Sequence, residues 1–433
     1  MTFWPGRLPL HWVRIGLLAV FVLITAVSSV PQAARAQTAD RGYLTSVSDL
    51  EAIGLEARWG VEPYAHLVAE FIESTDSPDE WEHGDVAEVL NVVDGDCASD
   101  SAPEGDRFVH QQGGAQEAFR KMIAYHLTHD VEYARVAREK ILELTTTTNY
   151  GGSVYDGSNE CILHLARALP LWIQAADLLS TEPVWTHEDR AQFSQWLVEV
   201  AYPKVAWASR VRRNNWGTAG SLSASMIADY VTGQEFRLTE IEPEQRDLTP
   251  EQAFQEHNEM QLRRMNTEWE GDSRCDIWGI QPTGAIPDEL RRGATGCTGD
   301  FLADNDDSYD YQVAQIDDLV FHAEYLRRRG NTGLFDNIAP DCSGSLLRAI
   351  LFVIANPINP DQSYRWPGYK LGVLNVANRY YHNPAVEEAL AADSLERGAT
   401  VSFGQLTHPD LPAADANGAP PVQSSTEVQS TCG

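Results

Sequence analysis

Apolar residues recur at helical spacing from about residue 47 to residue 395, and this periodicity restricts the chain to an architecture built from helices. Alternation of apolar and polar residues, which would indicate half-buried strands, is scarce. Turn residues separate the periodic segments and most connections are short, so we expect antiparallel helix pairs. The clearest helical segments are residues 62–74, 114–129, 131–145, 160–180, 187–204, 218–231, 250–269, 311–329, 344–355 and 385–395.

The segment 160–180 is apolar around most of its circumference, with Leu163 and Trp172 on opposite sides. A helix of this kind is buried on both sides, which is typical of the inner ring of a helical toroid, and Pro170 should kink it. No repeat of fixed period supports an open solenoid. We therefore predict an all-α fold, an (α/α) toroid or incomplete barrel of paired antiparallel helices with long active-site loops. These loops are residues 92–108, 271–310 and 357–368.

The N-terminus predicts a secretory signal peptide over residues 1–36. Arg7 and Arg14 precede an apolar run, and Ala34-Arg35-Ala36 offers a small-residue cleavage site. The run is shorter than the roughly 20 residues of a membrane-spanning helix, so we expect no membrane attachment after cleavage; an uncleaved anchor is the alternative. The mature protein would be periplasmic or secreted. It would comprise the toroid at residues 37–400 and an extended or disordered tail at 401–433.

Six cysteines in an exported chain fit up to three disulfides, and the sequence leaves their pairing open. One pairing, Cys275 with Cys297, would pin a long loop. No CxxC motif is present, and the acidic runs at 94–100 and 304–307 lack the EF-hand spacing. We therefore expect neither a metal nor another cofactor.

The chain is strongly acidic, with 63 Asp and Glu against 32 Lys and Arg and a formal net charge of -31. This charge disfavours binding of nucleic acid or of anionic membrane surfaces. An anionic ligand would therefore need a binding site that is locally basic. The sequence also lacks the P-loop, GxGxxG, HExxH and GxSxG motifs. No motif therefore supports a nucleotide-binding protein, a zinc protease or an α/β-hydrolase.

The first locally basic segment is a run of arginines that is followed by two asparagines and a tryptophan. It contains Arg210, Arg212, Arg213, Asn214, Asn215 and Trp216. Arginine forks and asparagine amides suit a carboxylate, and tryptophan offers a stacking face for a sugar ring. The alternative is that Asn214 or Asn215 caps the following helix while the arginines are solvated.

The second locally basic segment lies in the long loop 271–310 and precedes a pair of tyrosines. It contains Asp288, Glu289, Arg291 and Arg292, and Tyr309 and Tyr311 follow. β-Elimination from a uronic acid requires a partner for the carboxylate, a base for the C5 proton and an acid for the leaving 4-oxygen. A tyrosine can perform both proton transfers if neighbouring cations lower its pKa.

Together these motifs resemble the alginate lyase and related polyuronate lyase families over roughly residues 60–385. The resemblance implies an (α/α) toroid and metal-independent cleavage of an acidic polysaccharide outside the cytoplasm. By position, it implies that Asn215 binds the uronate carboxylate, that Arg292 assists, and that Tyr311 is base and acid, with Tyr309 as the alternative. We assign the neighbouring residues to substrate binding: Asn214, Trp216, Arg212, Arg213, Arg291 and Glu289.

One position departs from the family pattern, because Trp216 stands where these lyases have a histidine after the paired asparagines. His110, His164 and His257 are the candidates to replace it. We place His110 among the catalytic residues and assign Gln111, next to it, and His164 to substrate binding. A structural role for each histidine is the alternative.

The sequence thus predicts a monomeric, exported lyase whose partner is an anionic polysaccharide such as alginate. One alternative is a glycoside hydrolase on the same barrel, for which paired carboxylates are available among Glu160, Asp276, Asp288 and Glu289. The other is a non-catalytic polyuronate-binding protein, which Trp216 would favour.

Overall fold

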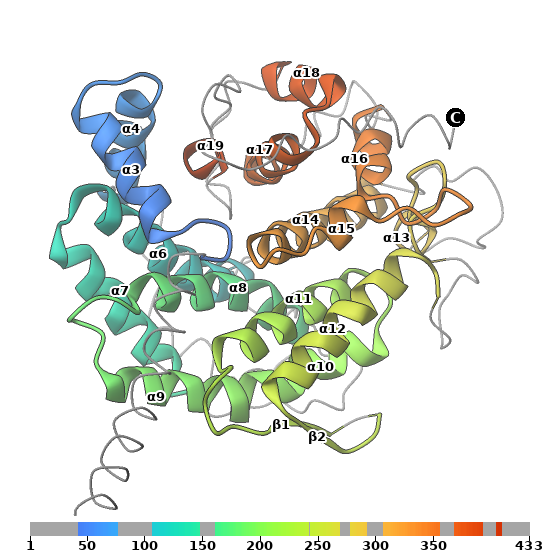
Figure 1. Ribbon diagram of the computed structural model, residues 1–433, viewed down its shortest axis with the longest axis horizontal. Coiled ribbons are helices and arrows are strands. Elements are labelled where there is room, and N and C mark those ends of the chain that lie inside the picture. The colour runs from blue at the N-terminus through green and yellow to red at the C-terminus, as the bar shows by residue number, and fades with distance from the viewer. Residues whose placement is uncertain are drawn as a thin grey trace, which may run out of the picture.

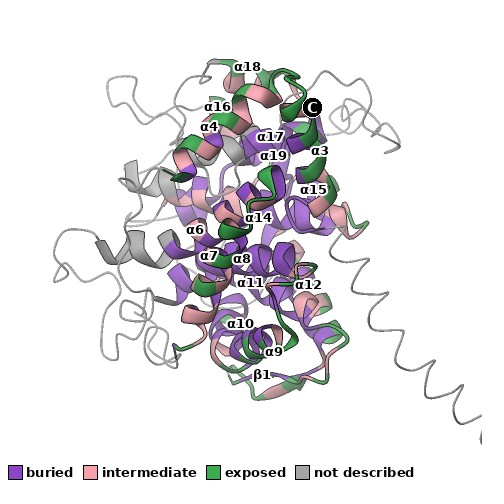
Figure 2. Cartoon of the chain, turned by 90° about the vertical axis from the view of Figure 1, so that its left-hand side faces the viewer, coloured by how far each residue is buried: buried purple, intermediate pink, exposed green. Residues whose placement is uncertain are grey.

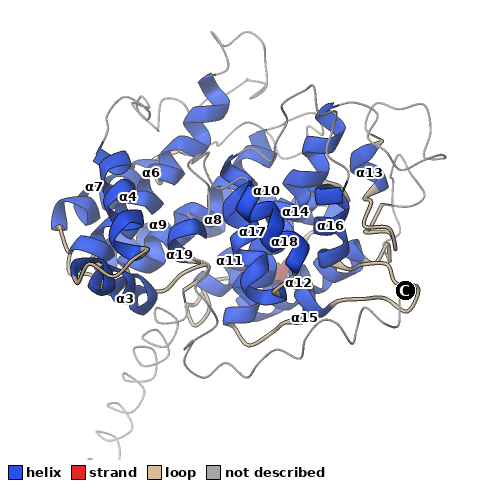
Figure 3. Cartoon of the chain, turned by 90° about the horizontal axis from the view of Figure 1, so that it is seen from above, coloured by secondary structure: helices blue, strands red, loops and turns tan. Residues whose placement is uncertain are grey.

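The computed structural model describes residues 42–76, 106–147, 161–241, 243–268, 278–291, 306–355, 368–392 and 404–408. These residues are largely helical (Figures 1 and 3). The helices before the centre of the chain are α3 (Val47–Arg58), α4 (Tyr64–Asp76), α6 (Asp106–Thr128), α7 (Val131–Leu144), α8 (Cys161–Leu179), α9 (His187–Trp196), α10 (Tyr202–Val211) and α11 (Asn215–Tyr230). Those after it are α12 (Pro250–Met265), α13 (Pro287–Leu290), α14 (Asp306–Arg328), α15 (Gly333–Asp336), α16 (Leu346–Ala355), α17 (Gly368–Tyr381), α18 (Pro384–Ala392) and α19 (Gly404–Thr407).

The strands of the described residues are confined to one hairpin. β1 (Leu238–Glu240) pairs antiparallel with β2 (Arg246–Leu248), with Leu238 opposite Leu248. The hairpin packs against α10 on the outside of the molecule (Figure 1). The predicted scarcity of strands is therefore confirmed for this part of the chain.

The helices pack as an inner ring with an outer layer. α11 lies between α8 and α14, α6 packs on the other side of α8, and α17 packs on α14. α10 and α12 cover α11 from outside, and α7 and α16 cover α6 and α14. This arrangement places most of α8 and α11 in the interior (Figure 2). Several helices begin with capping boxes, as at Ser46, Thr186 and Thr249, which fix their first turns.

α8 is the buried helix that the sequence predicted. Ile162–Leu179 is long and apolar enough to cross a membrane, but 94% of it is buried inside the protein. Pro170 lies within the helix and cannot donate to the carbonyl of Ala166. Ser223 of α11 donates its hydroxyl to that carbonyl instead, at 2.5 Å. The proline thereby creates a hydrogen bond between two inner helices.

The N-terminal segment covers one end of the inner ring. Leu44 donates its backbone N–H to Gln174 of α8, and the Tyr43 ring lies 5.2 Å from that of Tyr325 on α14. Arg328 pairs with Asp49 of α3 at 2.9 Å. The inner helices α8 and α14 are thus tied together through residues 42–49.

Helix boundaries differ from the predicted ones where a proline or a glycine interrupts the pattern. The predicted segment 187–204 continues to Val211, because a π-helical turn, Leu197–Ala201, carries the chain past Pro203. α17 and α3 were not singled out by the sequence pattern. In the segment 401–433, for which an extended or disordered tail was predicted, α19 forms one helical turn that packs on α17 and α4.

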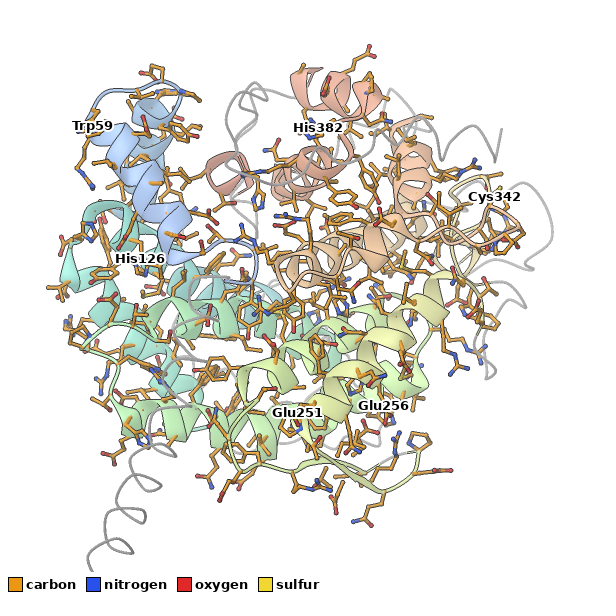
Figure 4. The ribbon with its side chains drawn as sticks, viewed as in Figure 1. Trp59, His126, Glu251, Glu256, Cys342 and His382 are labelled. Atoms are coloured by element: carbon orange, nitrogen blue, oxygen red, sulfur yellow. The ribbon has the colours of Figure 1, made fainter. Side chains whose placement is uncertain are left out.

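Cys342 lies in the turn after α15 and is disulfide-bonded (Figure 4). The side chains of the other cysteines lie outside the described residues, so the pairing of Cys275 with Cys297 stays a prediction.

Candidate active site

The inner helices run in the same direction. At their C-terminal ends, His126 of α6 hydrogen-bonds the carbonyl of Leu178 on α8 at 3.1 Å. Arg329, which follows α14, pairs with Asp229 near the end of α11 at 2.7 Å. Because the C-terminal ends meet, the N-terminal ends of α6, α8, α11 and α14 lie together at the opposite end of the ring. Helix N-termini carry a positive partial charge, which favours an anionic ligand there.

Most of the predicted site residues belong to these N-terminal turns. His110 and Gln111 lie in the first turns of α6, His164 in the first turn of α8, and Asn215 begins α11. Tyr311 lies in the second turn of α14 and is half-buried. The side chains of His110, Gln111 and Tyr309 lie outside the described residues, as does all of Arg292.

The paired asparagines form the start of α11. Asn214 is the N-cap residue, and its side chain accepts from the backbone N–H of Trp216 at 3.2 Å. The capping alternative raised by the sequence is therefore correct for Asn214. Asn215 is the first helical residue and is fully buried. The cap fixes the direction in which the chain enters the helix.

The two arginines before this cap lie against tryptophan rings rather than in solvent. The Arg212 guanidinium lies 5.3 Å from the centre of the Trp207 ring and 5.0 Å from that of Trp216. Arg213 lies 4.2 Å from the Trp278 ring and is only 4% exposed. Solvation, the other half of the capping alternative, is therefore wrong for Arg213, whereas Arg212 is half-buried against two tryptophan rings. Two cations are held at the entrance of α11 by aromatic faces.

Arg264 of α12 braces the same turn from behind. It donates to the carbonyls of Ser209 and Arg212 at 2.8 and 3.2 Å. Burial, and next the Arg213 guanidinium, lower the pKa of Arg264 to about 9, so it still carries its charge at neutral pH. Gly217 permits this packing, because a Cβ there would lie 1.9 Å from the Arg212 carbonyl oxygen.

The second sequence cluster is brought to the first by α13. Glu289 is fully buried, and its carboxylate accepts the backbone N–H of Asn215 at 2.5 Å. The backbone N–H of Ile286 donates to Gln312 on α14 at 2.9 Å. The segment before Arg291 is therefore fastened to the N-terminal turns of both α11 and α14. Glu289, predicted to contact substrate, is instead occupied with an N–H of the helix that carries Asn215.

His164 and Trp216 are more enclosed than the sequence predicted. His164 is fully buried, and desolvation followed by the charge of Arg167 lowers its pKa to about 3, so it is neutral. Trp216 is 9% exposed, and one face of its ring lies against Arg212. Both side chains therefore expose little surface that a ligand could contact.

His257 and Arg210 belong to a separate buried network on the outer side of α11. Arg210 pairs with Glu240 and Glu256 at 2.9 and 2.8 Å, and Glu256 lies on α12 (Figure 4). His257 lies 2.8 Å from the Ser209 hydroxyl and is fully buried. Burial by itself would raise the pKa of Glu240, but hydrogen bonds from His257 and Arg210 lower it to about 2. His257 is therefore no replacement for the missing histidine.

Sequence reasoning missed Trp278, Arg264 and Gln312. Trp278 lies in the long loop segment that had been recognised as functional, and an aromatic residue there was the available signal. Arg264 and Gln312 are ordinary polar residues of predicted helices, and the sequence carries no signal for them. Among the described residues, no group of three or more His, Cys, Asp or Glu side chains is arranged to hold a metal ion.

No family model matches the chain, and no curated protein matches it in sequence. Solved structures do match. An alginate lyase from Bacteroides ovatus superposes with a TM-score of 0.58 at 15% identity, over 86% of this chain and 99% of its own. An alginate lyase from a Sphingomonas species superposes with a TM-score of 0.50 at 13% identity, over 81% and 92%. The chain has the fold of these two alginate lyases. The predicted (α/α) toroid is thus confirmed.

Proposed function

We propose that this protein is an exported polysaccharide lyase that cleaves a uronic-acid-containing polysaccharide such as alginate by β-elimination. We base this proposal mainly on the surroundings of two arginines. In a chain of net charge -31, the arginines Arg212 and Arg213 are held on tryptophan rings beside the amide-bearing start of an inner helix. This part of the protein combines positive charge, amide groups and aromatic faces, which are the groups that bind an acidic sugar.

The reaction needs three groups at the sugar. A partner must neutralise the carboxylate so that the C5–H bond becomes acidic, and we assign this to Asn215 and Arg292. A base then removes the C5 proton, the electrons form the C4–C5 double bond, and the C4–O bond breaks. An acid protonates the leaving oxygen. We assign both proton transfers to Tyr311, which lies on the neighbouring inner helix, with Tyr309 and His110 as the alternatives.

Several other predicted residues support these groups. Asn214 caps α11 and Glu289 holds its first N–H, so both position Asn215. Trp216, Arg212, Arg213 and Arg291 remain our candidates for contacts to the sugar chain. In the proposed mechanism, Gln111 and His164 take part in no chemical step.

Export is part of the same proposal. Residues 1–36 are the signal peptide, and the mature enzyme acts in the periplasm or outside the cell as a monomer on a polymer that cannot cross the membrane. It uses no cofactor.

The test is to mix the purified protein with alginate, polymannuronate and glucuronan and to follow the ultraviolet absorbance of the unsaturated product. We expect the wild type to produce it. Tyr311→Phe, which removes the acid–base group, and Asn215→Ala, which removes a partner of the carboxylate, should each lose at least about 100-fold in kcat. Circular dichroism should show both variants folded. Loss of activity in Tyr309→Phe alone would move the proton transfers to Tyr309.

The other outcomes identify the competing functions. New reducing ends without the unsaturated product would indicate a glycoside hydrolase. Binding of uronate oligomers without any product would indicate a non-catalytic binding protein. No reaction and no binding on any uronate would reject the proposal.

A further inference from the structure

A pocket lies between α10, α12 and the turn of the hairpin β1–β2, on the outside of the ring (Figure 1). Its volume is about 290 Å³, near the lower end of the range for small-ligand sites. Three arginines line it, Arg210, Arg246 and Arg263. In a chain of net charge -31, three guanidinium groups around one pocket are unusual and favour an acidic ligand.

The three guanidinium groups differ in how far they are paired. Arg210 is fully engaged, because it pairs with both Glu240 and Glu256, at 2.9 and 2.8 Å. Arg246 pairs with Glu256 through Nη2 at 2.7 Å, but its Nη1 lies 3.7 Å from Glu240, which is too far for a hydrogen bond. Within the described residues, Arg263 forms no ion pair and donates only to a backbone carbonyl, at 3.4 Å. Arg246 and Arg263 therefore retain N–H groups for a ligand.

A ligand can reach the pocket from solvent. Arg263 and Glu244 are exposed, and the side chain of Arg246 is 34% exposed. Pro243 and Met260 add apolar atoms to the lining, on which the C–H groups of a sugar ring can pack. Two guanidinium groups, one carboxylate and an apolar surface match the carboxylate, the hydroxyls and the ring of a uronate.

The pocket and the entrance of the candidate site are neighbours on two helices. On α10, Arg210 lines the pocket, and Arg212 lies two residues later at the entrance, on a tryptophan ring. On α12, Arg263 lines the pocket, and the adjacent Arg264 donates to the carbonyl of Arg212. Val211, between the two arginines of α10, is 40% exposed. A sugar chain that leaves the entrance along this surface therefore reaches the pocket.

We propose that this pocket is an outer subsite, which binds one uronate residue of the sugar chain outside the candidate active site; this inference rests on the proposed function. Arg263 and Arg246 donate to the carboxylate of that residue, and Glu244 accepts from one of its hydroxyls. Arg210 stays paired with its two acids. The negative charge of Glu244 repels the sugar carboxylate, so the subsite adds only modestly to affinity.

Arg263→Gln and Glu244→Gln test the subsite, because their expected effects have opposite signs. The measurement is steady-state kinetics on whichever of alginate, polymannuronate and glucuronan the wild type cleaves fastest. Arg263→Gln should raise KM about fivefold, because a charge-assisted hydrogen bond is lost. Glu244→Gln should lower KM about twofold, since the amide oxygen still accepts from the hydroxyl while the repelling charge is gone. Neither variant should change kcat.

The matched controls are Arg237→Gln and Glu235→Gln. Both residues are exposed and lie outside the pocket, and Arg237, like Arg263, donates to a backbone carbonyl. The controls make the same changes in net charge and should match the wild type. Equal changes of KM in the variants and in their controls would reflect net charge alone and would overturn the subsite.

Chain length separates the outer subsite from the candidate active site. The shortest uronate oligosaccharides that the wild type cleaves should be bound by the active site alone, so their KM should be the same in the wild type and in Arg263→Gln. An equal rise of KM for these oligosaccharides and for the polymer would overturn the subsite. So would an unchanged KM for the polymer. In either case cleavage by the wild type would leave the proposed function standing.

The same comparison works if cleavage fails. Calorimetry would then give the dissociation constants of the polymer for the wild type and for Arg263→Gln. Weaker binding by Arg263→Gln, without cleavage by the wild type, would support the subsite and reject the lyase. A wild type that neither cleaves nor binds uronates would overturn both proposals.

Discussion

Arg210 and Arg213 lie three positions apart in sequence and have different partners. Arg210 is neutralised by Glu240 and Glu256 on the outer side of α11. Arg213 lies on the face of Trp278 at the entrance of the candidate site. A cluster of arginines in a sequence therefore contains both structural and candidate binding groups. Only the partners, which come from elements distant in sequence, distinguish them.

Glu289 provides a prediction at the scale of one residue. Its carboxylate accepts from the first N–H of α11, where a negative charge also interacts well with the helix dipole. We expect Glu289→Gln to lower the free energy of unfolding by about 1–2 kcal/mol. It should also reduce kcat/KM, because Asn215 is no longer held in place.

The matched control is Glu188→Gln, in the exposed first turn of α9. Denaturant unfolding and uronate kinetics measure both effects. If Glu289→Gln behaved like the control in both assays, the positioning role of Glu289 would be wrong.

At the scale of elements, the close approach of α10 and α11 forms the turn that holds the candidate site. Gly217 and Gly220 allow it, because a Cβ at Gly220 would lie 2.7 Å from the backbone nitrogen of Ser209. Ser209 and Ser221 are hydrogen-bonded at 2.7 Å, which fastens the two helices in the same region. The geometry of the Arg212–Asn214 turn is thus set by helix packing.

Gly217→Ala tests this packing. In an ordinary helix interior the change from Gly to Ala stabilises by about 0.5–1 kcal/mol. Here we expect destabilisation by about 1–3 kcal/mol from overpacking, together with loss of activity, since the added Cβ would meet the Arg212 carbonyl oxygen.

Gly333→Ala at the start of α15 is the control, because its closest contact is the movable side chain of Asn331 at 2.9 Å. Thermal unfolding and uronate kinetics are the measurements. A stable and fully active Gly217→Ala protein would contradict the packing argument.

At the scale of the whole molecule, the two ends of the inner ring carry different charged residues, and residues 42–46 cover one of them. The N-terminal ends of the helices carry the candidate site. The C-terminal ends meet at Asp177, Asp229 and Arg329 and are covered by residues 42–46. Burial, and next the charge of Asp229, raise the pKa of Asp177 to about 7, while Arg329 opposes the rise.

This raised pKa predicts how stability depends on pH. The folded protein binds a proton at Asp177 more tightly than the unfolded chain, whose value is 3.8. The resulting stabilisation is complete below pH 3.8 and is lost as pH rises through 7. Over this window Asp177 contributes about 4 kcal/mol. We expect the stability of Asp177→Asn, relative to that of the wild type, to be lower at pH 5 than at pH 8.

Urea unfolding at pH 5 and pH 8 measures this slope. Asp318 contributes with the same sign, whereas the buried histidines His164 and His322, whose pKa values are lowered, contribute with the opposite sign. The quantity that tests Asp177 is therefore the difference in slope between the variant and the wild type. The exposed acid Asp247, changed to Asn, is the control and should leave the slope unchanged. An unaltered slope in Asp177→Asn would show that Asp177 is not the group responsible.

The helical class, the buried inner helix at 160–180 and the approximate bounds of most helices could be predicted from the sequence, because apolar periodicity is a local property. It also located the segments around Asn215 and Glu289, since unusual charge and amide content is visible without a fold. Three contacts could not be predicted in this way: Glu289 accepts the first N–H of the helix of Asn215, Arg210 is neutralised by acids, and Arg213 lies on Trp278. These outcomes depend on distances between residues far apart in the chain, and such distances are set by how the helices pack.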